Sequence, residues 1–226
     1  MSAMSGLPKM YRGKRLLDLA ILALAIPALP IFMVIAGLVY LFHGSPVLFR
    51  QWRAGLNGEP FQILKFRSMT SAVDREGNPL SDGDRLTSFG RFLRATSLDE
   101  IPELLNVLRG EMSIVGPRPL HLRYVKRYSP EQRRRLEVLP GVTGWAQVNG
   151  RNGISWEERF TLDVEYTTRM SFGLDLKILF LTVFRVVAGS GITQAGHATM
   201  TEFMGSKTRH EPALMTEMEG VGRHAQ

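Results

Sequence analysis

The chain has 226 residues, no cysteine, and a formal net charge of +7 from 28 Lys and Arg against 21 Asp and Glu. This length suits one catalytic domain with an anchor and is too short for two large domains. Without cysteine, disulfide bonds, thiolate metal sites and a cysteine nucleophile are excluded, and the chain has no need of an oxidising compartment. The positive charge suits a nucleic acid, an anionic membrane surface or a phosphorylated substrate equally well.

The segment from Leu19 to Phe42 carries no charged side chain. As a helix rising about 1.5 Å per residue, it is long enough to cross a hydrocarbon core of about 30 Å. Pro27 and Pro30 near its middle predict a bend or a break. Basic residues flank both ends, namely Lys9, Arg12, Lys14 and Arg15 before it and Arg50 and Arg53 after it. The positive-inside preference therefore places both flanks in the cytosol, and a re-entrant hairpin satisfies both this preference and the expected bend. A kinked transmembrane helix is the commoner structure for such a segment, so the residues alone leave the two topologies open.

Beyond this segment, apolar runs around a turn at residues 54–58 predict a short β-hairpin over residues 46–69. The Asp-, Gly- and Asn-rich residues 71–84 indicate a surface loop. Helical spacing returns over residues 85–94. The string Ser97-Leu98-Asp99-Glu100 fits a capping box, with a helix expected from about Leu98 to Leu108.

The second half of the chain is richer in Pro and Gly. The two prolines of Pro117-Arg118-Pro119 forbid a helix and favour a rigid extended turn. Residues 130–139 predict a short basic helix, and residues 140–153, which contain four glycines, predict a loop. Residues 174–188 are too short for a span and predict an interfacial or core helix. Beyond Gly205 the composition is typical of a mobile polar tail.

The adjacent acids Asp99 and Glu100 are the main candidates for chemistry. On a helix their side chains point about 100° apart, so they cannot share one proton, although they can serve different partners. An ionised Asp is a plausible nucleophile toward phosphorus, and its Glu neighbour could hold Mg²⁺. Helix capping and compensation of the helix dipole explain the same pair without any catalytic role.

Several cations could neutralise a diphosphate beside these acids, although each is by default a solvated charge. An arginine fixed between prolines loses little backbone entropy on binding, and the planar fork of Arg118 matches a phosphate or a uracil edge. Lys65, Arg67, Arg91 and Arg94 are the other candidates. Trp145 and Trp156 are interpreted as core or interface residues. The five histidines lack metal spacing, so no zinc site is expected, and the basic run 118–135 is better matched to a phosphate or lipid headgroup than to a nucleic acid.

Several strings together resemble a known family. They are Lys65-Phe66-Arg67-Ser68-Met69, Ser97-Leu98-Asp99-Glu100, residues 106–113 (NVLRGEMS), residues 115–119 (VGPRP) and residues 140–151 (PGVTGWAQVNGR). In this order they are similar to the bacterial sugar transferases, and more narrowly to the small monotopic phosphoglycosyl transferases. The resemblance runs from about Lys14 to Thr201.

The resemblance implies a ping-pong reaction. Asp99 matches the family's aspartate, which attacks the β-phosphate of a UDP-sugar so that UMP leaves, and polyprenyl phosphate then takes the phosphosugar from the enzyme. Glu100 matches the family's Mg²⁺-associated glutamate. Lys65 and Arg94 match cations close to the site, and Pro117-Arg118-Pro119 matches a motif near the nucleotide. Lys14, Arg15 and Asp18 match residues at the start of the membrane helix.

The family also implies a re-entrant membrane hairpin, and the break here is expected at Pro27 or Pro30, because Leu29-Pro30 stands where a Ser-Pro pair is common. The expected fold is α+β and mostly helical. It comprises a re-entrant membrane helix (1–45), a cytosolic catalytic domain (46–205) with a short β-hairpin and interfacial amphipathic helices, and a mobile polar tail (206–226). The expected location is the bacterial inner membrane, with the catalytic domain on the cytosolic face.

The expected partners are a UDP-sugar, undecaprenyl phosphate and membrane lipids, with downstream glycosyltransferases as further candidates and no nucleic acid. The string 145–152 (WAQVNGRN) and Gly196-His197-Ala198-Thr199 look most similar to transferases acting on diacetylbacillosamine. UDP-galactose or UDP-glucose as donor is the alternative. A non-catalytic basic membrane scaffold is a third hypothesis, from another functional class.

Overall fold

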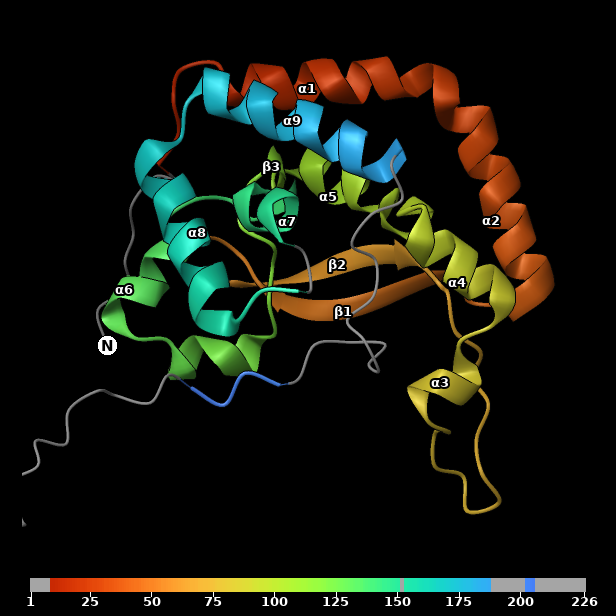
Figure 1. Ribbon diagram of the computed structural model, residues 1–226. Coiled ribbons are helices and arrows are strands. Elements are labelled where there is room, and N and C mark those ends of the chain that lie inside the picture. Colours follow the sequence, from red (N-terminus) through yellow and green to blue (C-terminus); the bar gives the residue numbers. More distant parts are fainter. Residues whose placement is uncertain (1–8, 151–152, 188–201, 206–226) are drawn as a thin grey trace, which may run out of the picture.

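The computed structural model describes residues 9–150, 153–187 and 202–205 (Figure 1). These residues form a mixed α/β protein that is mostly helical, with two small sheets of two strands each. The expected tail at 206–226, Arg151, Asn152 and the string 196–199 lie outside the described residues. The expected α+β, mostly helical class is therefore confirmed for the described part of the chain.

The apolar N-terminal segment is a helix interrupted by one short turn. Helix α1 (Lys14–Ala25) is followed by the 3₁₀ turn η1 (Ile26–Ala28) and by helix α2 (Leu29–His43), and the chain changes direction sharply at η1 (Figure 1). Pro27 lies inside the turn, and Pro30 lies in the first turn of α2. There the missing N–H of a proline costs no helical hydrogen bond. Both prolines therefore contribute to the break.

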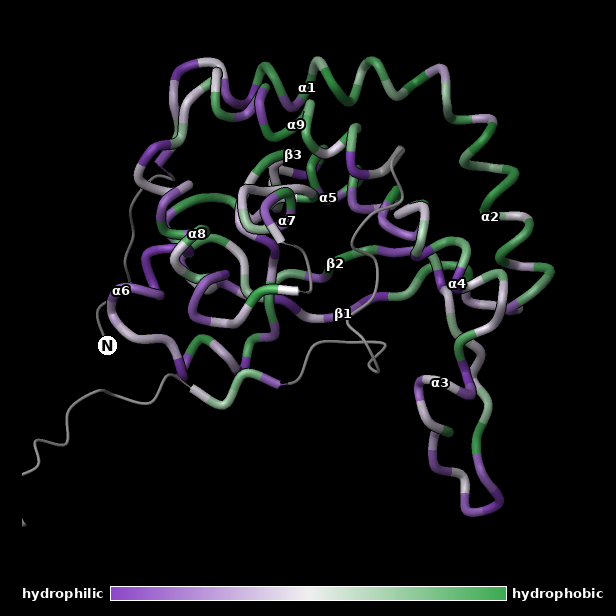
Figure 2. Tube along the Cα trace, in the orientation of Figure 1, coloured by the Kyte–Doolittle hydropathy of each residue, from purple (hydrophilic) through white to green (hydrophobic). Residues whose placement is uncertain are grey.

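Most apolar side chains of α1 and α2 face away from the protein. Figure 2 shows the two helices as largely hydrophobic, and the exposed residues include Leu16, Leu19, Leu24, Ile31, Met33, Val34, Leu41 and Phe42. By length and composition the helical segment Lys14–His43 could cross a membrane, and only 6% of its most apolar window is buried. A soluble protein rarely exposes so large an apolar surface unless something covers it.

Polar residues at the start of α1 dock this helix onto the rest of the protein. The Asp18 carboxylate accepts hydrogen bonds from the Ser113 hydroxyl at 2.8 Å and the Ile114 backbone N–H at 2.9 Å. Arg15 donates to the backbone carbonyls of Val107 at 2.6 Å and Leu108 at 2.9 Å. These carbonyls belong to the end of helix α5 (Glu103–Arg109). The arginine thereby satisfies groups that the helix itself leaves free.

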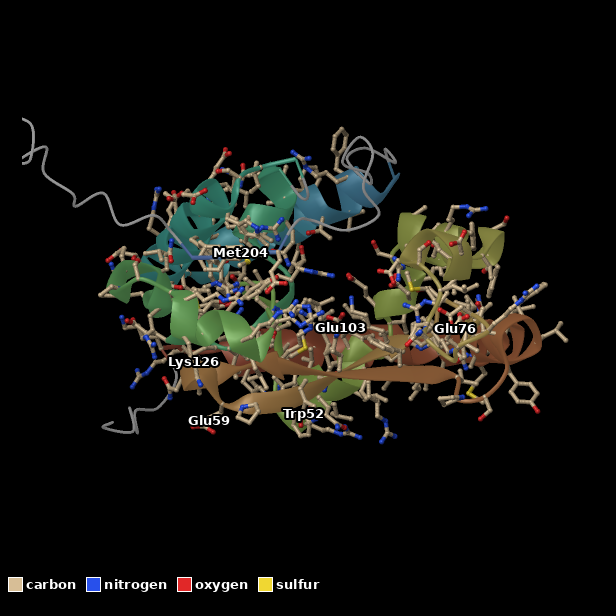
Figure 3. The ribbon with its side chains drawn as sticks, turned by 90° about the horizontal axis from the view of Figure 1, so that it is seen from below. Trp52, Glu59, Glu76, Glu103, Lys126 and Met204 are labelled. Atoms are coloured by element: carbon tan, nitrogen blue, oxygen red, sulfur yellow. The ribbon has the colours of Figure 1, made fainter. Side chains whose placement is uncertain are left out.

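The expected β-hairpin is confirmed. Strand β1 (Leu48–Ala54) pairs antiparallel with β2 (Pro60–Phe66), and the 3₁₀ turn η2 (Leu56–Gly58) joins them. Arg53 pairs with Phe61 and Phe49 with Lys65. Because side chains alternate between the two faces of a strand, these four lie on one face of the hairpin. In Figure 3, Glu103 and Trp52 lie on opposite sides of the hairpin.

The expected capping box at Ser97 is wrong. Ser97 has a left-handed backbone with φ of 58°, and its side chain makes no capping hydrogen bond. Ser97 lies between helix α4 (Ser88–Ala95) and the 3₁₀ turn η3 (Leu98–Glu100). Helix α5 begins only at Glu103. Pro102 explains the delay, because a proline is tolerated just before or in the first turn of a helix and not in its interior. The loop expected at 71–84 is present, apart from the four-residue helix α3 (Asp82–Arg85).

The expected loop at 140–153 is also wrong in part. Strand β4 (Gly141–Thr143) pairs parallel with β3 (Ser113–Val115), and helix α7 (Trp145–Asn149) follows at once. Gly141 and Gly144 allow the backbone to pack closely against Gly116, and they are not signs of a loop. A Cβ atom at Gly141 would lie 2.0 Å from the Gly116 nitrogen, and one at Gly144 would lie 2.1 Å from the Gly116 oxygen.

The remaining helical segments complete the described fold. They are η4 (Leu122–Arg127), α6 (Pro130–Arg133), η5 (Arg134–Leu136), α8 (Trp156–Arg169) and α9 (Phe172–Val187). Helix α9 runs beside α1 (Figure 1), and Ile178 of α9 is fully buried in the same cluster that Ile21 and Leu22 of α1 pack against. Phe203, from the short described segment 202–205, is buried among Tyr124, Tyr128 and Phe160.

Candidate active site

Acids and cations from four separate segments meet at η3. Asp99 and Glu100 come from η3 itself, Glu103 from the first turn of α5, Lys65 from β2, and Arg118 from the turn between the two prolines. Lys65 Nζ lies 2.7 Å from Glu100 Oε1 and 3.0 Å from Glu103 Oε1, and Arg118 Nη2 lies 2.6 Å from Glu100 Oε1. Five charged groups are thereby concentrated in one small, largely buried region.

Asp99 is held without a strong partner of its own. Its side chain is only 8% exposed, and within the described residues its carboxylate accepts no hydrogen bond and forms no ion pair. Burial, followed by the negative charge of Glu100, raises the pKa of Asp99 to about 6, against the opposing effect of Lys65, Arg118 and Arg94. At neutral pH the group is therefore mostly ionised and weakly solvated, which suits a nucleophile.

Glu100 has the opposite environment. Burial alone would raise the pKa of Glu100, but the charges and hydrogen bonds of Arg118 and Lys65 outweigh burial and hold that pKa well below its usual range. The attraction to Glu100 in turn raises the pKa of Arg118 further above its already high value. Two neighbouring carboxylates with pKa values pushed apart are typical of sites in which each acid has its own role.

Glu103 is a third acid that the sequence argument missed. It is completely buried, and burial together with the Glu100 charge raises its pKa to about 7 even though Lys65 opposes the shift. Figure 3 shows it near the middle of the molecule. Its place three residues after Glu100 was the available signal, because residues three apart share one face of a helix.

Arg94 reaches the same region from α4. Its Nε donates to the Ser68 hydroxyl at 2.9 Å, and its positive charge acts on Asp99. Gly90 makes this approach of α4 possible, because a Cβ atom there would lie 1.8 Å from the Ser68 carbonyl oxygen. The other two candidate cations lie elsewhere. Arg67 donates hydrogen bonds to the Ser45 and Met69 carbonyls. Arg91 donates hydrogen bonds to the Leu86 carbonyl and the Ser88 hydroxyl.

The turn that carries Arg118 is fixed on both sides. Pro117 and Pro119 are buried, the Pro117 carbonyl accepts the Gly141 N–H at 3.0 Å, and the Arg118 carbonyl accepts Arg135 Nη2 at 2.7 Å. Arg135 is itself held by Asp163 of α8 at 2.8 Å. The prolines are therefore structural, and their effect is to present the Arg118 guanidinium at Glu100 without further ordering cost.

A second group of cations continues from Arg118 away from Asp99. It includes Arg53 of β1 and Arg159 of α8, neither of which was predicted from the sequence to be a site residue. Burial, and the repulsion of neighbouring arginines that include Arg118, lowers the pKa of both guanidinium groups to about 10. Burial and the charges of Arg53 and Arg123 lower the pKa of His121 to about 4, so this histidine is neutral at pH 7.

Trp145 and Trp156 are half-buried packing residues, as expected, against the two main core clusters. Within the described ranges, His, Cys, Asp and Glu form no group of three that could hold a metal ion by themselves. The structure thus gathers Asp99, Glu100, Lys65, Arg94 and Arg118 at one place, with both prolines of the turn behind Arg118. Their chemical roles stay predictions.

Residues 9–189 match the family model described as bacterial sugar transferase. The chain belongs to the bacterial sugar transferase family. It is 54% identical over 195 residues to the uncharacterized sugar transferase EpsL of Bacillus subtilis (strain 168), a match that covers 85% of this chain and 96% of EpsL. Membership of the bacterial sugar transferase family, which includes relatives named as sugar-1-phosphate transferases, confirms the expectation of an enzyme, a phosphoglycosyl transferase, and gives no support to a non-catalytic scaffold.

Two further members of this sugar transferase family carry named activities. The UDP-glucose:undecaprenyl-phosphate glucose-1-phosphate transferase of Caulobacter vibrioides is 43% identical over 181 residues, which cover 75% of this chain and 68% of the relative. The galactosyl transferase CpsE of Streptococcus agalactiae is 38% identical over 180 residues, which cover 70% of this chain. The match spans only 40% of the length of CpsE.

Proposed function

We propose that this sugar transferase moves a sugar 1-phosphate from a UDP-sugar to a polyprenyl phosphate through a covalent intermediate on Asp99. The observation that carries the proposal is the arrangement of the two adjacent acids. Asp99 is buried, lacks a described partner and has a raised pKa, while the adjacent Glu100 takes up both Lys65 and Arg118. Because Lys65 and Arg118 pair with Glu100, the Asp99 carboxylate stays free to act as a nucleophile.

In the first half-reaction, an Asp99 carboxylate oxygen attacks the β-phosphorus of the UDP-sugar. The bond between that phosphorus and the bridging oxygen breaks, and the electron pair leaves on the phosphate of UMP. In the second half-reaction, a phosphate oxygen of the polyprenyl phosphate attacks the same phosphorus, and Asp99 departs as a free carboxylate. Lys65, Arg94 and Arg118 stabilise the charge on the transferred phosphoryl oxygens in both steps.

The residues present fit a Mg²⁺ ion that is held mostly by substrate. Mg²⁺ commonly binds one or two carboxylates and otherwise substrate phosphates and water, so it does not need a cage of three protein acids. Lys65 and Arg118 both bond to Oε1 of Glu100. Glu100, with Asp99 beside it, is the carboxylate that would hold the ion. When bound, Mg²⁺ would neutralise charge on the diphosphate.

Both ends of the membrane helices contact the same catalytic domain, which supports a re-entrant hairpin. Asp18 and Arg15 bond to β3 and α5, while His43, the last residue of α2, lies 2.8 Å from the Thr87 hydroxyl at the start of α4. A complete span takes about 20 helical residues, and α1 and α2 are each shorter than that. Two ends on one domain lie on one side of the bilayer, so the site faces the cytosol, where UDP-sugars occur.

The Caulobacter relative, named a UDP-glucose:undecaprenyl-phosphate transferase, favours UDP-glucose as donor and undecaprenyl phosphate as acceptor, and the galactosyl transferase CpsE favours a galactose donor. They give no support to diacetylbacillosamine, which rests on two sequence strings that lie partly outside the described residues. A product of this kind is the first lipid-linked intermediate of a polysaccharide, and downstream glycosyltransferases would act on it. The inner membrane of a bacterium is the location that this chemistry requires.

The test is UMP release by the detergent-solubilised protein with Mg²⁺ and a panel of UDP-sugars, with and without undecaprenyl phosphate. We expect one donor to support sustained release only when the lipid is present. Failure of every donor, including rare diacetamido sugars, would contradict the proposal. Chelation of the metal is expected to abolish release, and full activity in EDTA would contradict the Mg²⁺ site alone.

A further inference from the structure

Arg53 is a largely buried arginine that the proposed chemistry does not use. Its Nη2 donates to the Gln51 side-chain oxygen at 2.6 Å, two residues away on the same strand. Its Nε is buried and has no hydrogen-bond partner within the described residues. Unpaired polar groups in protein interiors are rare and costly, and a guanidinium group has five N–H donors to satisfy. An internal bond to Gln51 leaves most of that capacity unused.

The backbone brings Arg53 beside the turn that carries Arg118. The Ala54 N–H donates to the Leu120 carbonyl at 2.9 Å, so the end of β1 is bonded to the chain two residues after Arg118. The pairing of β1 with β2 places Arg53 on the same face of the hairpin as Lys65. Arg53 is paired with Phe61, four residues before Lys65 on β2, so the two positions lie about 13 Å apart along the hairpin. Arg53 therefore lies at the far end of the line of charges that begins at Lys65.

The charges around Arg53 are mainly positive. Arg118 and Arg123 act on it directly, and Glu103, which acts against them, is paired with Lys65. Buried positive groups that repel one another are unfavourable unless an anion enters to pair with them. This end of the site is therefore complementary to a negatively charged group rather than to a neutral one such as a uracil ring.

We propose that Arg53, together with Arg118, binds the phosphate of the nucleotide that leaves in the first half-reaction. The inference rests on the proposed function. When the bond to the bridging oxygen breaks, the electron pair stays on the nucleotide, and its phosphate gains one negative charge. A fixed guanidinium group beside this oxygen stabilises the charge in the transition state and binds the product UMP afterwards. Arg53 is thus a leaving-group binding residue, distinct from the cations around the transferred phosphoryl group.

The experiment compares the affinities of UMP and uridine for the full-length protein in detergent. For the unaltered protein, we expect UMP to bind at least tenfold more tightly than uridine. Arg53→Gln removes the charge while keeping a side-chain N–H donor, and we expect it to weaken UMP binding about tenfold, the usual size of one charge-assisted hydrogen bond. Uridine affinity should change less than about twofold. Arg50→Gln is the matched control, because Arg50 lies on the same strand and is exposed, and it should alter neither affinity.

Two results would overturn the inference. One is an unchanged UMP affinity in folded Arg53→Gln; the other is an equal loss of UMP and uridine affinity, which would assign Arg53 to the base. If Arg53→Gln does not fold, Arg53→Lys is the second variant. It keeps the positive charge without the paired N–H donors of the guanidinium group, and it should lose part of the preference for UMP over uridine. Equal affinities of UMP and uridine for the unaltered protein would contradict the site without any variant. Failure of the proposed function is separate, since it appears as no UMP release from any UDP-sugar.

Discussion

The Lys14 ammonium group and the Asp175 carboxylate form a buried ion pair at 2.6 Å between the first residue of α1 and helix α9. Lys14 also donates to the Val115 carbonyl at 2.7 Å, and the Tyr166 hydroxyl donates to Asp175 at 2.8 Å. The start of the membrane segment is thereby bonded to the strand that leads into the Pro117-Arg118-Pro119 turn. The anchor and the catalytic site form one structural unit at this point.

We therefore predict that Lys14→Met destabilises the whole fold. Removing one partner of a buried pair leaves Asp175 as an uncompensated charge, which typically costs about 3 to 5 kcal/mol. The thermal midpoint of the solubilised protein should fall by about 10 °C. Arg12→Gln is the control, because Arg12 is exposed and only two residues away. Equal midpoints for the two variants would refute a structural role for the Lys14–Asp175 pair.

Gly90→Ala should displace α4 and with it Arg94. The added Cβ atom would lie 1.8 Å from the Ser68 carbonyl oxygen, a clash with backbone that cannot relax by a side-chain rotation. We expect a loss of stability of about 2 kcal/mol or more and a marked loss of UMP release. Gly173→Ala in α9 is the matched control, since nothing lies within 4 Å of its Cβ position and alanine favours helix. A folded, fully active Gly90→Ala would contradict the packing described for α4.

The rate of UMP release should report the ionisation of Asp99. The ionised form is the nucleophile, and its pKa is about 6. For that reason kcat/KM for the donor should rise with pH up to about that value and then level off. Glu100 raises this pKa, whereas Lys65 lowers it. The residual activity of Glu100→Gln should therefore rise at lower pH than in the parent, and that of Lys65→Met at higher pH. Shifts in the same direction for both variants would argue against Asp99 as the titrating group.

Glu103→Gln should change how stability depends on pH. The pKa of Glu103 is raised to about 7 in the folded protein, so the folded state binds more protons than the unfolded state at pH 5 to 7. The free energy of unfolding must then fall as pH rises through this window. Glutamine cannot ionise, so the variant should be more stable than the parent at pH 8, by about 3 kcal/mol, and similar to it at pH 5.

Urea unfolding at the two pH values measures this difference. Glu131→Gln is the control, because Glu131 is exposed on α6 and its replacement should leave the pH dependence unchanged. A Glu103→Gln variant that is less stable than the parent at pH 8 would show that the pair with Lys65 outweighs the cost of burying the charge.

Local patterns predicted the parts of the fold that depend on local chemistry. Apolar runs on both sides of the turn at residues 54–58 were enough for the β-hairpin, and Pro27 and Pro30 were enough for the break between α1 and α2. The β3–β4 pair was missed because it joins Ser113 to Gly141 across a long separation. Its glycines, read as loop signals, are needed because the two backbones lie too close for a Cβ atom.

The candidate site was predictable where a motif carried the residue and not otherwise. Asp99, Glu100 and Arg118 stood in recognisable strings. Glu103 and Arg53 did not, because their importance comes from burial and from neighbours contributed by distant segments. Arg53 looks like one of many basic residues until the Ala54–Leu120 hydrogen bond places it beside Arg118.

The most direct test of the covalent mechanism is a single turnover without lipid acceptor. The solubilised protein is mixed with Mg²⁺ and the UDP-sugar it uses, and both UMP and the intact protein mass are measured. We predict a burst of about one UMP per protein and a mass increase equal to the phosphosugar on the peptide that contains Asp99. Asp99→Asn should give neither. Release of UMP only when undecaprenyl phosphate is also present, with no change in protein mass, would contradict a covalent intermediate on Asp99.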